Sequence, residues 1–551
     1  MTLHISIEYK TSWGEEIVLC LGGKRYPLVY TSAGIWEGEI SRLNVGKAAE
    51  YCYEVVRDGQ TVRSEWKKHQ LILPEGMKAK TVTVYDKWNE RPADSPFYSS
   101  AFTDAIFGRP AVKAAKAGKG ENVLLQVAVP TVRPNEVLAL AGSGKTLKDW
   151  GKVIPFDASQ YPVWTLALNV TEPFEYKLLI ADKDTLAPVA WEDGDNRWFA
   201  SLPQKDEVVV EADLQVRFSG RDWKGAGTAI PVFSLRTEDD FGVGEFYDLK
   251  KMVDWAAATG QSILQLLPIN DTTMLHTWED SYPYNPNSTF ALHPQFLHLP
   301  AAGVKVDAAY KALQAELNSL EQIDYERVNN AKLELLHKAF DKTFKKLSAT
   351  AGYQSFVEKN AHWLMPYAAF CVLRDLNGTP DFSQWKGYAK YNRKKVAAFC
   401  EEHKADVDFW CFVQYHLDLQ LSEVCKYAHS RGVIFKGDLP IGISRTSVDA
   451  WLYPELFHMD SQEHHLMHSL QTARTGDSLH TTGRRWLRTD MHGGSHALQR
   501  CLSTSTHSVS TTYSDSSAYG RFLSGRRAVS TATSTRHSLI LQMNLRARDS
   551  T

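Results

Sequence analysis

The feature that most constrains the fold is a pattern that occurs twice in this chain: an amphipathic segment, a glycine, and an apolar run that ends in polar residues. The first copy is FYDLKKMVDWAAATG with SILQLLPI, residues 246–260 and 262–269. The second is VDFWCFVQYHLDLQLSEVCKYAHSRG with VIFKGDLPIGI, residues 407–432 and 433–443. Helical spacing with a glycine stop predicts helices, and continuous apolar runs predict buried parallel strands. This alternation is typical of a (β/α) barrel.

The first 215 residues have a different texture. β-Branched runs such as KTVTVYD, ENVLLQVAV and DEVVVEADLQV are broken by Gly, Asn and Asp, as in β-sandwiches. EYCYEVVRDGQTVRSEW (50–66) and EYKLLIADKDTLAPVAW (175–191) form an internal repeat, because a Trp follows the Glu-Tyr pair at the same spacing in both. An earlier Trp, Trp36 or Trp164, is expected to open the preceding strand. We therefore predict two copies of one β-sandwich module.

These patterns predict the domain organisation. Two β-sandwich modules occupy residues 1–100 and 118–215, and the N-terminal part of an α/β barrel of the (β/α)8 type occupies 225–462. A tail of different composition follows at 463–551. The segments FTDAIFGRPAVKAAKAGKG and RFSGRDWKGAG are interpreted as linkers because they are rich in small and polar residues. A chain of 551 residues is long enough for several domains.

The composition excludes some classes of partner. The formal net charge of −2 does not favour nucleic acid or an anionic membrane as a partner. The N-terminus MTLHISIEYK has no basic segment followed by an apolar run, so no signal peptide is expected, and no apolar run is long enough for a membrane span. The seven cysteines are scattered and form no CxxC pair. They are interpreted as reduced thiols of a cytoplasmic protein.

One motif suggests nucleotide binding. VLALAGSGKTLKDW contains Gly-Ser-Gly-Lys-Thr, as a phosphate-binding loop does. That loop requires a glycine five residues before the last glycine, where this chain has Ala139, and it requires a following helix. The surrounding sequence is instead that of a β-module. Lys145 is therefore interpreted as a solvated turn residue.

Several longer motifs resemble a known enzyme family. They are IPVFSLRTEDDFGVGEFYDLKKMVDWAAATGQSILQLLPIN, then DSYPYNPNSTFALHPQFL, then KGDLPIGISRTSVDAWLYPELF. In this order they resemble the 4-α-glucanotransferases of glycoside hydrolase family 77 (amylomaltases, or disproportionating enzymes), from about Gly225 to Gln462. The resemblance implies transfer of α-1,4-glucan segments between maltose, malto-oligosaccharides and larger glucans such as starch or glycogen, by a retaining double displacement. It implies no cofactor and no metal.

The two N-terminal modules resemble family 20 starch-binding modules. In that family two exposed Trp rings stack on adjacent glucose units, and a Lys and an Asn hold sugar hydroxyls. The second module has Trp150, Lys177, Trp191 and Asn196 at the matching positions. For any single Trp, packing in the core stays an alternative. The first module has Cys52 where the second has Lys177 and no clear counterpart of Trp150, so it is either a weaker binder or a structural spacer.

Two residues of the barrel match active-site positions of family 77. Tyr284 of SYPYNP resembles the tyrosine beside the donor sugar, and the alternative is a tyrosine that packs the loop. Asp438 of KGDLPIG follows an apolar strand and resembles an aspartate that lines the active-site cleft, and the alternative is a loop cap. Asp449 and Trp451 of SVDAW resemble family scaffold near the same face, without an assigned role.

Other acidic residues of this region need not be catalytic. Asp239 and Asp240 lie in a Gly-rich turn and are interpreted as turn formers rather than as acids. The family's two catalytic carboxylates are a nucleophile in an Arg-Ile-Asp-His motif and a later acid/base Glu. Neither is found in this chain, which has no Arg-Ile-Asp-His after Gln462 and no Glu after Glu463.

The tail has an unusual composition. Residues 464–551 contain no Lys, Glu or Pro, but 28 Ser or Thr, 11 Arg and 8 of the 19 His. Lys and Glu are normally among the commonest residues, so this absence needs an explanation. Codons permitted for TARTGDSLHTTG (472–483) encode Gly-Gln-Asn-Trp-Gly-Phe-Pro-Thr-Tyr-Asn-Trp in the next frame, which is the sequence that the family has at this point. Glu463 with HHLMHS likewise permits Ala-Pro-Pro-Asp-Ala.

The same shift recovers the missing nucleophile. THSVSTTYSD (506–515) permits Ala-Phe-Arg-Ile-Asp-His-Ile-Leu-Gly, in which the aspartate codon straddles Ser510 and Thr511. We therefore interpret the tail as a frameshift product that begins near residues 462–464, without a native fold. Its histidines are not interpreted as a zinc site, and its arginines are not interpreted as a nucleic-acid patch.

Three hypotheses follow from the sequence. The chain is an active 4-α-glucanotransferase whose coding sequence carries a frame error, or a truncated product with starch-binding modules and part of a barrel, or a non-enzymatic glucan-binding protein. An incomplete barrel would leave open strand edges and an exposed apolar interior.

Overall fold

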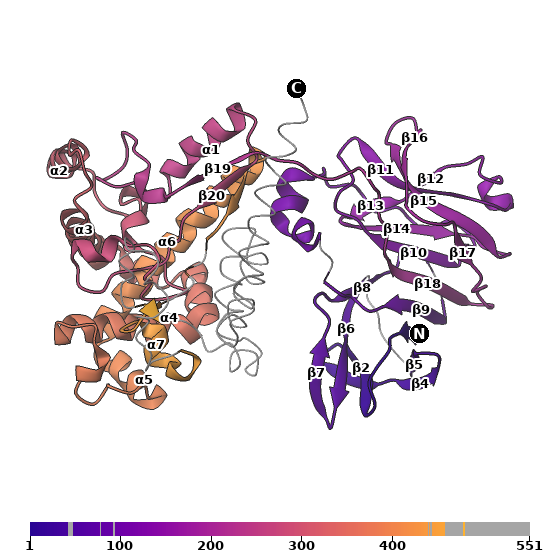
Figure 1. Ribbon diagram of the computed structural model, residues 1–551, viewed down its shortest axis with the longest axis horizontal. Helices are drawn as coiled ribbons and strands as arrows, with labels where there is room; N and C mark the ends of the chain where they lie inside the picture. The colour runs from indigo at the N-terminus through magenta and orange to yellow at the C-terminus, as the bar shows by residue number, and fades with distance from the viewer. Residues whose placement is uncertain are drawn as a thin grey trace, which may run out of the picture. The chain divides into compact units, whose positions relative to one another are not determined.

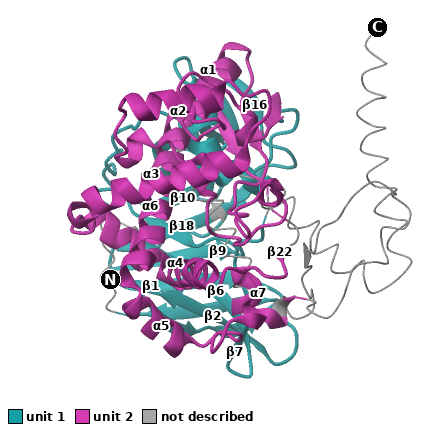
Figure 2. Ribbon diagram, turned by 90° about the vertical axis from the view of Figure 1, so that its left-hand side faces the viewer, with its two compact units in different colours: residues 1–224 teal, residues 225–551 magenta. Residues whose placement is uncertain are grey.

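The computed structural model of the chain describes residues 1–41, 48–77, 79–91, 94–438, 440, 443–457 and 478–479. It contains two compact units, Met1–Lys224 and Gly225–Thr551, which the two ribbon views distinguish (Figures 1 and 2). Apart from Ser478 and Leu479, the tail at 463–551 lies outside the described residues, and so do Ser510 and Thr511. The frameshift interpretation therefore stays a prediction.

Within its described residues, the first unit is built from β-strands, as its β-branched runs predict. Its first half contains β1 (Thr2–Glu8), β2 (Glu15–Leu21), β3 (Lys24–Pro27), β4 (Val29–Ser32), β5 (Ile35–Ile40), β6 (Ala48–Arg57), β7 (Gln60–Ser64), β8 (His69–Ile72) and β9 (Thr81–Lys87). Its second half contains β10 (Val123–Ala128), β11 (Glu136–Gly142), β12 (Ile154–Pro155), β13 (Asp157–Gln160), β14 (Val163–Leu168), β15 (Phe174–Asp182), β16 (Pro188–Trp191), β17 (Arg197–Phe199) and β18 (Glu207–Leu214).

The strands of the two halves are arranged alike. Strands β3-β2-β6-β7, with β8 beside β6, form a five-stranded sheet in the first half, and β12-β11-β15-β16, with β17 beside β15, form one in the second half. The indole N–H of Trp36 in β5 donates to the carbonyl of Tyr9, and that of Trp164 in β14 donates to Val129. Both rings are buried. The predicted repeat of one β-module therefore extends to the hydrogen bonds of these two tryptophans.

The two halves share one sheet, which the sequence repeat did not predict. One continuous eight-stranded sheet has the order β13-β14-β10-β18-β9-β1-β5-β4, so strands of both halves lie in it (Figure 1). The last strand of each half, β9 and β18, pair in parallel from Thr81 opposite Glu207 to Tyr85 opposite Glu211. The halves meet edge to edge, where each strand completes the hydrogen bonding of the other.

The segments predicted as polar linkers also differ from the expectation. Phe102 and Phe107 of the first segment are buried. Trp223 of the second segment contacts Phe102 edge to face, with ring centroids 5.0 Å apart. Arg221 Nη2 lies 2.5 Å from Glu136 Oε2, which anchors the second segment to β11. Both segments therefore fold onto the sandwich instead of forming free linkers.

The second unit contains helices and short strands in its described residues. Its elements are β19 (Gly227–Ile230), α1 (Asp248–Ala258), β20 (Ile263–Leu266), α2 (Ala308–Asn318), α3 (Tyr325–Leu347), α4 (Ala351–Asn377), α5 (Arg393–Glu402), α6 (Lys404–Ser430), β21 (Ile434–Lys436), β22 (Ile443–Ser444), α7 (Val448–Leu452) and β23 (Ser478–Leu479). Helices α2 to α6 follow one another between β20 and β21. In α1, Leu249, Val253 and Ala256 recur at helical spacing and are fully buried.

The helix–glycine–strand pattern is confirmed twice. Helix α1 ends before Gly260 and is followed by β20, and α6 ends before Gly432 and is followed by β21. Both glycines have positive φ, 72° and 68°, which favours glycine at a helix C-terminus. Strands β19, β20 and β21 form a parallel sheet in that order, as buried apolar runs predict. Their carboxyl ends therefore lie at one edge of the sheet.

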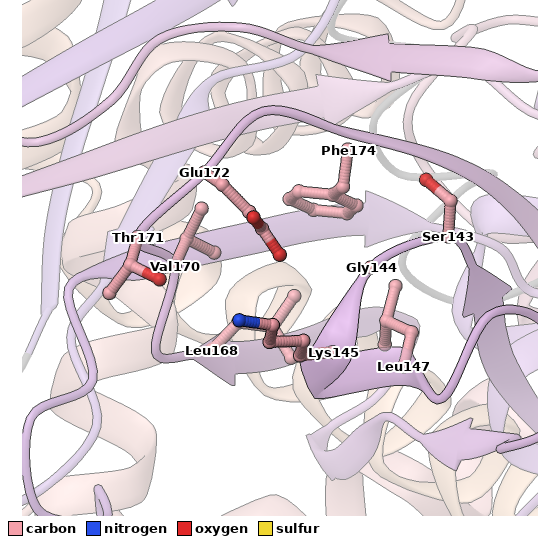
Figure 3. Close-up of a pocket in the computed structure, with 9 residues that line it drawn as sticks. All are labelled: Ser143, Gly144, Lys145, Leu147, Leu168, Val170, Thr171, Glu172 and Phe174. Atoms are coloured by element: carbon pink, nitrogen blue, oxygen red, sulfur yellow. The ribbon is translucent and has the colours of Figure 1, made fainter.

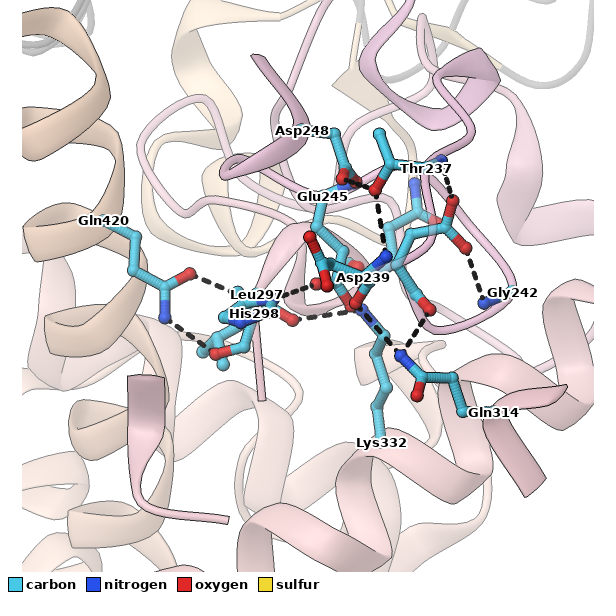
Figure 4. Close-up of polar contacts among 12 residues, drawn as sticks. Thr237, Asp239, Gly242, Glu245, Asp248, Leu297, His298, Gln314, Lys332 and Gln420 are labelled. Carbon is cyan, nitrogen blue, oxygen red and sulfur yellow. Dashed lines mark hydrogen bonds and ion pairs between the residues drawn. The ribbon is translucent and has the colours of Figure 1, made fainter. Parts of the chain in front are cut away.

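A buried ion pair holds the loop before α1. Lys332 Nζ of α3 lies 2.5 Å from Glu245 Oε1 and donates to the carbonyl oxygens of Gln295 and Leu297. His298 Nδ1 lies 2.7 Å from Glu245 Oε2. Figure 4 shows these side chains converging on Glu245. A buried charge is tolerated only when it is paired and hydrogen-bonded in this way.

Of the two aspartates in the same loop, Asp240 is a turn former as predicted, whereas the carboxylate of Asp239 pairs with Lys251 of α1. Asp240 accepts the backbone N–H of Thr237 at 2.6 Å and that of Gly242 at 3.2 Å. Asp239 is exposed and lies 3.4 Å from the ammonium of Lys251. Asp248 accepts the Thr237 hydroxyl, and burial raises the pKa of Asp248 to about 6. These carboxylates are used by the turn and by the start of α1.

None of the helices in the described residues combines the length and the hydropathy of a membrane span. Cys371, Cys400, Cys411 and Cys425 are buried, and no disulfide joins the cysteines of the described ranges.

Candidate functional site

The four residues predicted to bind glucan in the second module all belong to one sheet. Trp150 lies in the loop after β11, Lys177 lies in β15, Trp191 ends β16, and Asn196 immediately precedes β17. Strand β15 is central, because it pairs with β11, β16 and β17. The sheet thus brings together positions that are up to 46 residues apart.

The two tryptophans lie side by side on the surface. Their ring centroids are 6.5 Å apart and their planes make an angle of 57°. Trp150 is 37% exposed and Trp191 is 44% exposed, so neither ring is a core side chain. The core-packing alternative is therefore wrong for this pair. Two exposed and mutually inclined aromatic faces suit the apolar faces of neighbouring sugar rings on a curved oligosaccharide.

The polar partners surround the loop between β16 and β17. Lys177 Nζ donates a 2.6 Å hydrogen bond to the carbonyl oxygen of Gly194. Asn196 is exposed in the same loop. Glu192, which is buried, accepts the backbone N–H of Leu178 and a bidentate contact from Arg197 at 2.7–3.0 Å. The loop that carries Trp191 and Asn196 is therefore anchored at both ends.

The loop that carries Trp150 has unusual backbone conformations. Lys148, Asp149 and Trp150 have φ values of 52°, 45° and 70°, in the left-handed region that side chains other than glycine rarely adopt. The N–H of Trp150 donates to the carbonyl of Gly142 at 2.6 Å, and Asp149 Oδ1 accepts the N–H of Gly144 at 2.8 Å. These bonds offset the strain and hold the Trp150 ring at the surface.

The Gly-Ser-Gly-Lys-Thr motif belongs to this loop. A Cβ on Gly142 would overlap the carbonyl oxygen of Glu175, and Gly144 has a φ of 86°. Lys145 begins a three-residue 3₁₀ turn rather than an α-helix and is exposed, as predicted (Figure 3). The cavity beside the motif is small, about 20 Å³. The glycines shape the Trp150 loop, which explains the motif without a nucleotide.

The corresponding face of the first module has other residues at the positions of Trp191 and Lys177. Glu65 accepts the N–H of Tyr53 at 2.8 Å, as Glu192 accepts that of Leu178 at 2.7 Å, so Glu65 and Glu192 are structural equivalents. The residue before each glutamate is then Ser64 in the first module and Trp191 in the second.

The strand pairing gives the same correspondence. Ser64 lies opposite Glu54, and Trp191 lies opposite Leu179, the equivalent strand position. The equivalence of Trp66 with Trp191, which the repeat spacing suggested, is therefore wrong. The first module closes its hairpin with the short turn Asp58–Gly59, whereas the second uses a longer turn after Asp182, which moves the register by two residues. Cys52 of the first module does occupy the position that Lys177 has in the second, and it lies opposite Cys20.

The two candidate cleft residues of the second unit are in contact. Tyr284 follows β20 and Asp438 follows β21, and the hydroxyl of Tyr284 donates to Asp438 Oδ2 at 2.8 Å. They meet because β20 and β21 are parallel neighbours whose carboxyl ends adjoin. Burial and the neighbouring Asp438 raise the pKa of Tyr284 to about 12. The tyrosine is therefore neutral near pH 7 and acts as a hydrogen-bond donor.

The loop with Tyr284 is held by the segment after β21. The N–H of Thr289 donates to Asp449 Oδ2 at 2.7 Å, and the N–H of Val448 donates to the carbonyl of Asn287 at 3.0 Å. Asp449 is buried, and burial raises its pKa to about 6. Trp451 is buried against Phe370 and Trp385, and its indole N–H donates to the carbonyl of Tyr388. Both residues of the SVDAW motif are thus internal supports of this region.

Comparisons with known proteins match two parts of the chain to family models. A family model described as 4-α-glucanotransferase, glycoside hydrolase family 77, matches residues 230–496. A model described as starch binding domain matches residues 121–210. The chain carries a family 77 glucanotransferase domain and a family 20 starch-binding domain. The glucanotransferase match continues past Gln462, the limit expected from the motifs.

The chain is also similar to individual proteins, as follows. The 4-α-glucanotransferase DPE2 of Oryza sativa subsp. japonica is 34% identical over 502 residues, which covers 84% of this chain and 52% of the relative. A 4-α-glucanotransferase of Chlamydia muridarum is 36% identical over 243 residues, covering 42% of this chain and 44% of the relative. A solved amylomaltase from Streptococcus agalactiae in complex with acarbose is 20% identical with a TM-score of 0.43, covering 52% of this chain and 58% of that structure. The chain spans about half the length of the curated relatives it matches.

Sequence reasoning missed several supporting residues of both domains. In the starch-binding domain these are Asp149, Glu192 and Arg197, whose roles depend on contacts with backbone groups. In the glucanotransferase domain the family resemblance found Asp449 but not its bond to Thr289. The sequence signal for the conformation of the Trp150 loop is its two glycines, which also fit part of a phosphate-loop pattern.

Proposed function

We propose that this protein belongs to α-1,4-glucan metabolism and that its glucanotransferase domain is built to transfer glucan segments between malto-oligosaccharides. The contact between Tyr284 and Asp438 at the ends of two adjacent parallel strands carries this proposal. It provides a neutral aromatic hydroxyl and a carboxylate at the edge of the sheet where barrel enzymes hold their substrates. In the complete domain β19, β20 and β21 would be three strands of a (β/α)8 barrel.

The proposed chemistry is retaining transfer. One carboxylate attacks the anomeric carbon while a carboxylic acid about 5–5.5 Å away protonates the leaving oxygen. The hydroxyl of an acceptor sugar then takes the glucosyl unit in place of water. Tyr284 and Asp438 would orient the sugar ring at the cleavage point. The nucleophile is proposed in the shifted frame at Ser510 and Thr511, which lie outside the described residues.

For the starch-binding domain we propose a surface glucan site. The inclined rings of Trp150 and Trp191 would stack on neighbouring glucose units, and Lys177 and Asn196 would bind hydroxyls at the rim. Exposure of both rings and their contact support this proposal. Starch, glycogen and malto-oligosaccharides are the proposed partners, and no nucleic acid, membrane or cofactor is required. The scattered cysteines support a cytoplasmic location.

One observation favours a second candidate function. The chain contains no Arg-Ile-Asp-His motif after Gln462 and no Glu after Glu463. A chain of this sequence would then bind glucans without transferring them. The two candidates predict different outcomes in two experiments.

The first experiment measures glucose release from maltose by the 551-residue chain. The frameshift interpretation predicts none, and measurable transfer would show that the missing nucleophile is supplied from elsewhere in the chain. The second experiment is resequencing of the DNA that encodes residues 460–466. An intact reading frame there would remove the active-enzyme interpretation and leave the glucan-binding protein. Retention on starch granules tests the binding site in either case.

A further inference from the structure

Strand β18 of the starch-binding domain has partners on both edges. It pairs in parallel with β10 on one edge and with β9 of the first module on the other. As the last strand of a separate module, β18 would need only the β10 partner, and its second edge would be open to water. The first module closes that edge along five paired positions, from Glu207 to Glu211.

The two faces of β18 also belong to different cores. Successive side chains of a strand point to opposite faces of the sheet. Val209 is buried in the core of the starch-binding domain, whereas its neighbours Val208 and Val210 are buried in the core of the first module. All three are at most 2% exposed. The three consecutive valines of DEVVVEADL are therefore all apolar because the strand is buried on both faces, one in the core of each module.

Strand β10 repeats this division. Leu125 lies in the core of the starch-binding domain, and Leu124 lies in the core of the first module. Gln126 is buried and points to the same side as Leu124, and its amide donates a 3.1 Å hydrogen bond to the carbonyl of Gln70 in β8. A polar side chain in the middle of a buried strand is therefore bonded to the backbone of the first module.

The first module meanwhile differs from the starch-binding domain at two positions of the proposed glucan site. Ser64 and Cys52 occupy the positions of Trp191 and Lys177. A serine hydroxyl provides no flat apolar surface for a sugar ring, and a thiol is a much weaker hydrogen-bond donor than an ammonium.

We propose that the first module is not a second glucan-binding module but a structural partner that completes the starch-binding domain, and that the two fold and unfold together. The module supplies an edge strand, an apolar cover for Leu124, Val208 and Val210, and a backbone acceptor for Gln126. A starch-binding domain without it would expose a sheet edge and an apolar face. The functional part of the proposal rests on the glucan site proposed at Trp150 and Trp191.

The first test uses hydrogen exchange on the intact chain and needs no glucan. In a strand with two partners, the amides that face either neighbour are hydrogen-bonded, so we expect alternate amides of β18 to be protected to a similar degree. Fast exchange of one alternate set would show that β9 does not pair with β18, and would overturn the shared fold.

The second test separates the modules energetically. Leu19 is fully buried in β2, outside the shared sheet, and Leu19→Asp should unfold the first module. We expect exchange protection in β10 and β14 to fall with that in β2, and starch retention to fall at least tenfold. Val84→Asp in β9 provides an independent variant of the same kind. Protection of β10 and β14 that survives loss of β2 would overturn the proposal.

The third test asks whether the first module binds glucan itself. The double variant Trp150→Ala, Trp191→Ala should lose all saturable retention on starch granules, whereas Ser64→Ala and Cys52→Ser should retain wild-type binding. Residual saturable binding of the double variant that is sensitive to Ser64 or Cys52 would overturn the structural role. If the wild-type chain itself binds no starch, the proposed glucan site fails, but the exchange experiments still decide whether the two modules fold together.

Discussion

The hydroxyl of Tyr284 donates a 2.8 Å hydrogen bond to Asp438, a residue 154 positions later in the chain. A double-mutant cycle of Tyr284→Phe and Asp438→Asn should therefore show coupling. We expect each single change to lower the free energy of unfolding by about 1 kcal/mol, and the double change to cost little more than either, because one bond is lost in all three. Urea unfolding followed by fluorescence measures these values. Additive effects would mean that the two side chains do not interact in solution.

The starch site can be tested with a matched pair of tryptophans. Trp191 and Trp198 are both exposed on the starch-binding domain, at 44% and 65%, but only Trp191 contacts Trp150. Trp191→Ala should weaken retention on starch granules about tenfold, which corresponds to about 1.4 kcal/mol of lost stacking. Trp198→Ala should bind like the wild type. Equal losses in both variants would point to a general effect on the fold rather than to stacking.

The strained loop before Trp150 leads to a prediction about Asp149. Its carboxylate accepts the N–H of Gly144, and its own φ of 45° is in the left-handed region. Asp149→Ala should weaken starch retention several-fold, because the loop would lose both the bond and a residue that tolerates this conformation. Asp149→Asn should restore most of the binding, since asparagine accepts the same bond and adopts positive φ readily. Wild-type binding by Asp149→Ala would show that Trp150 needs no such support.

The buried carboxyl group of Asp449 predicts a pH dependence. Burial raises its pKa to about 6, so the folded chain holds this proton more tightly than the unfolded chain, in which the pKa is near 4. This contribution to stability is fully present below about pH 4 and is lost as the pH rises through about 6. Asp449→Asn cannot ionise, so its stability relative to the wild type should increase by up to about 3 kcal/mol between these pH values. A pH-independent difference would contradict the raised pKa.

The ion pair between Glu245 and Lys332 predicts that a single variant loses more free energy of unfolding than a double variant that removes both charges. Both side chains are 1% exposed. Lys332→Met should cost about 3–5 kcal/mol of unfolding free energy, because it leaves the Glu245 carboxylate buried without its cation. Adding Glu245→Gln should recover a large part of that loss. The exposed pair of Lys251 and Glu238 is the control, and Lys251→Met should cost less than about 1 kcal/mol.

The elements of the second unit were predictable because each was encoded locally. The apolar spacing of Leu249, Val253 and Ala256 and the stop at Gly260 define α1, and the run after it defines β20. Parallel pairing then follows from burial on both faces. From this alone one can expect that the loops after β20 and β21, which carry Tyr284 and Asp438, start at one edge of the sheet. Their hydrogen bond was not predictable, because it depends on how a loop of 17 residues folds back after β20.

The first unit shows where local reasoning fails. Equal spacing suggested that Trp66 corresponds to Trp191, but a turn of different length moves the register of one hairpin by two residues. Side chains alternate along a strand, and their neighbours across it are set by pairing, so a shift of register changes which residue occupies a site. Glu65 and Glu192 reveal the true correspondence only through the backbone groups that they bind.

The sequence by itself determined the kinds of element, the order of the two units, the family of the second unit and the four side chains of the candidate starch site. Periodicity and motifs act over short stretches, and these features are encoded there. Only the tertiary structure decided that β9 and β18 join the two modules in one sheet, that Trp150 is held by a strained loop, and that Ser64 of the first module occupies the strand position of Trp191. Those outcomes depend on pairing between segments far apart in the chain. An edge strand pairs with a strand that hydrogen-bonds its free backbone N–H and C=O groups and covers its apolar face.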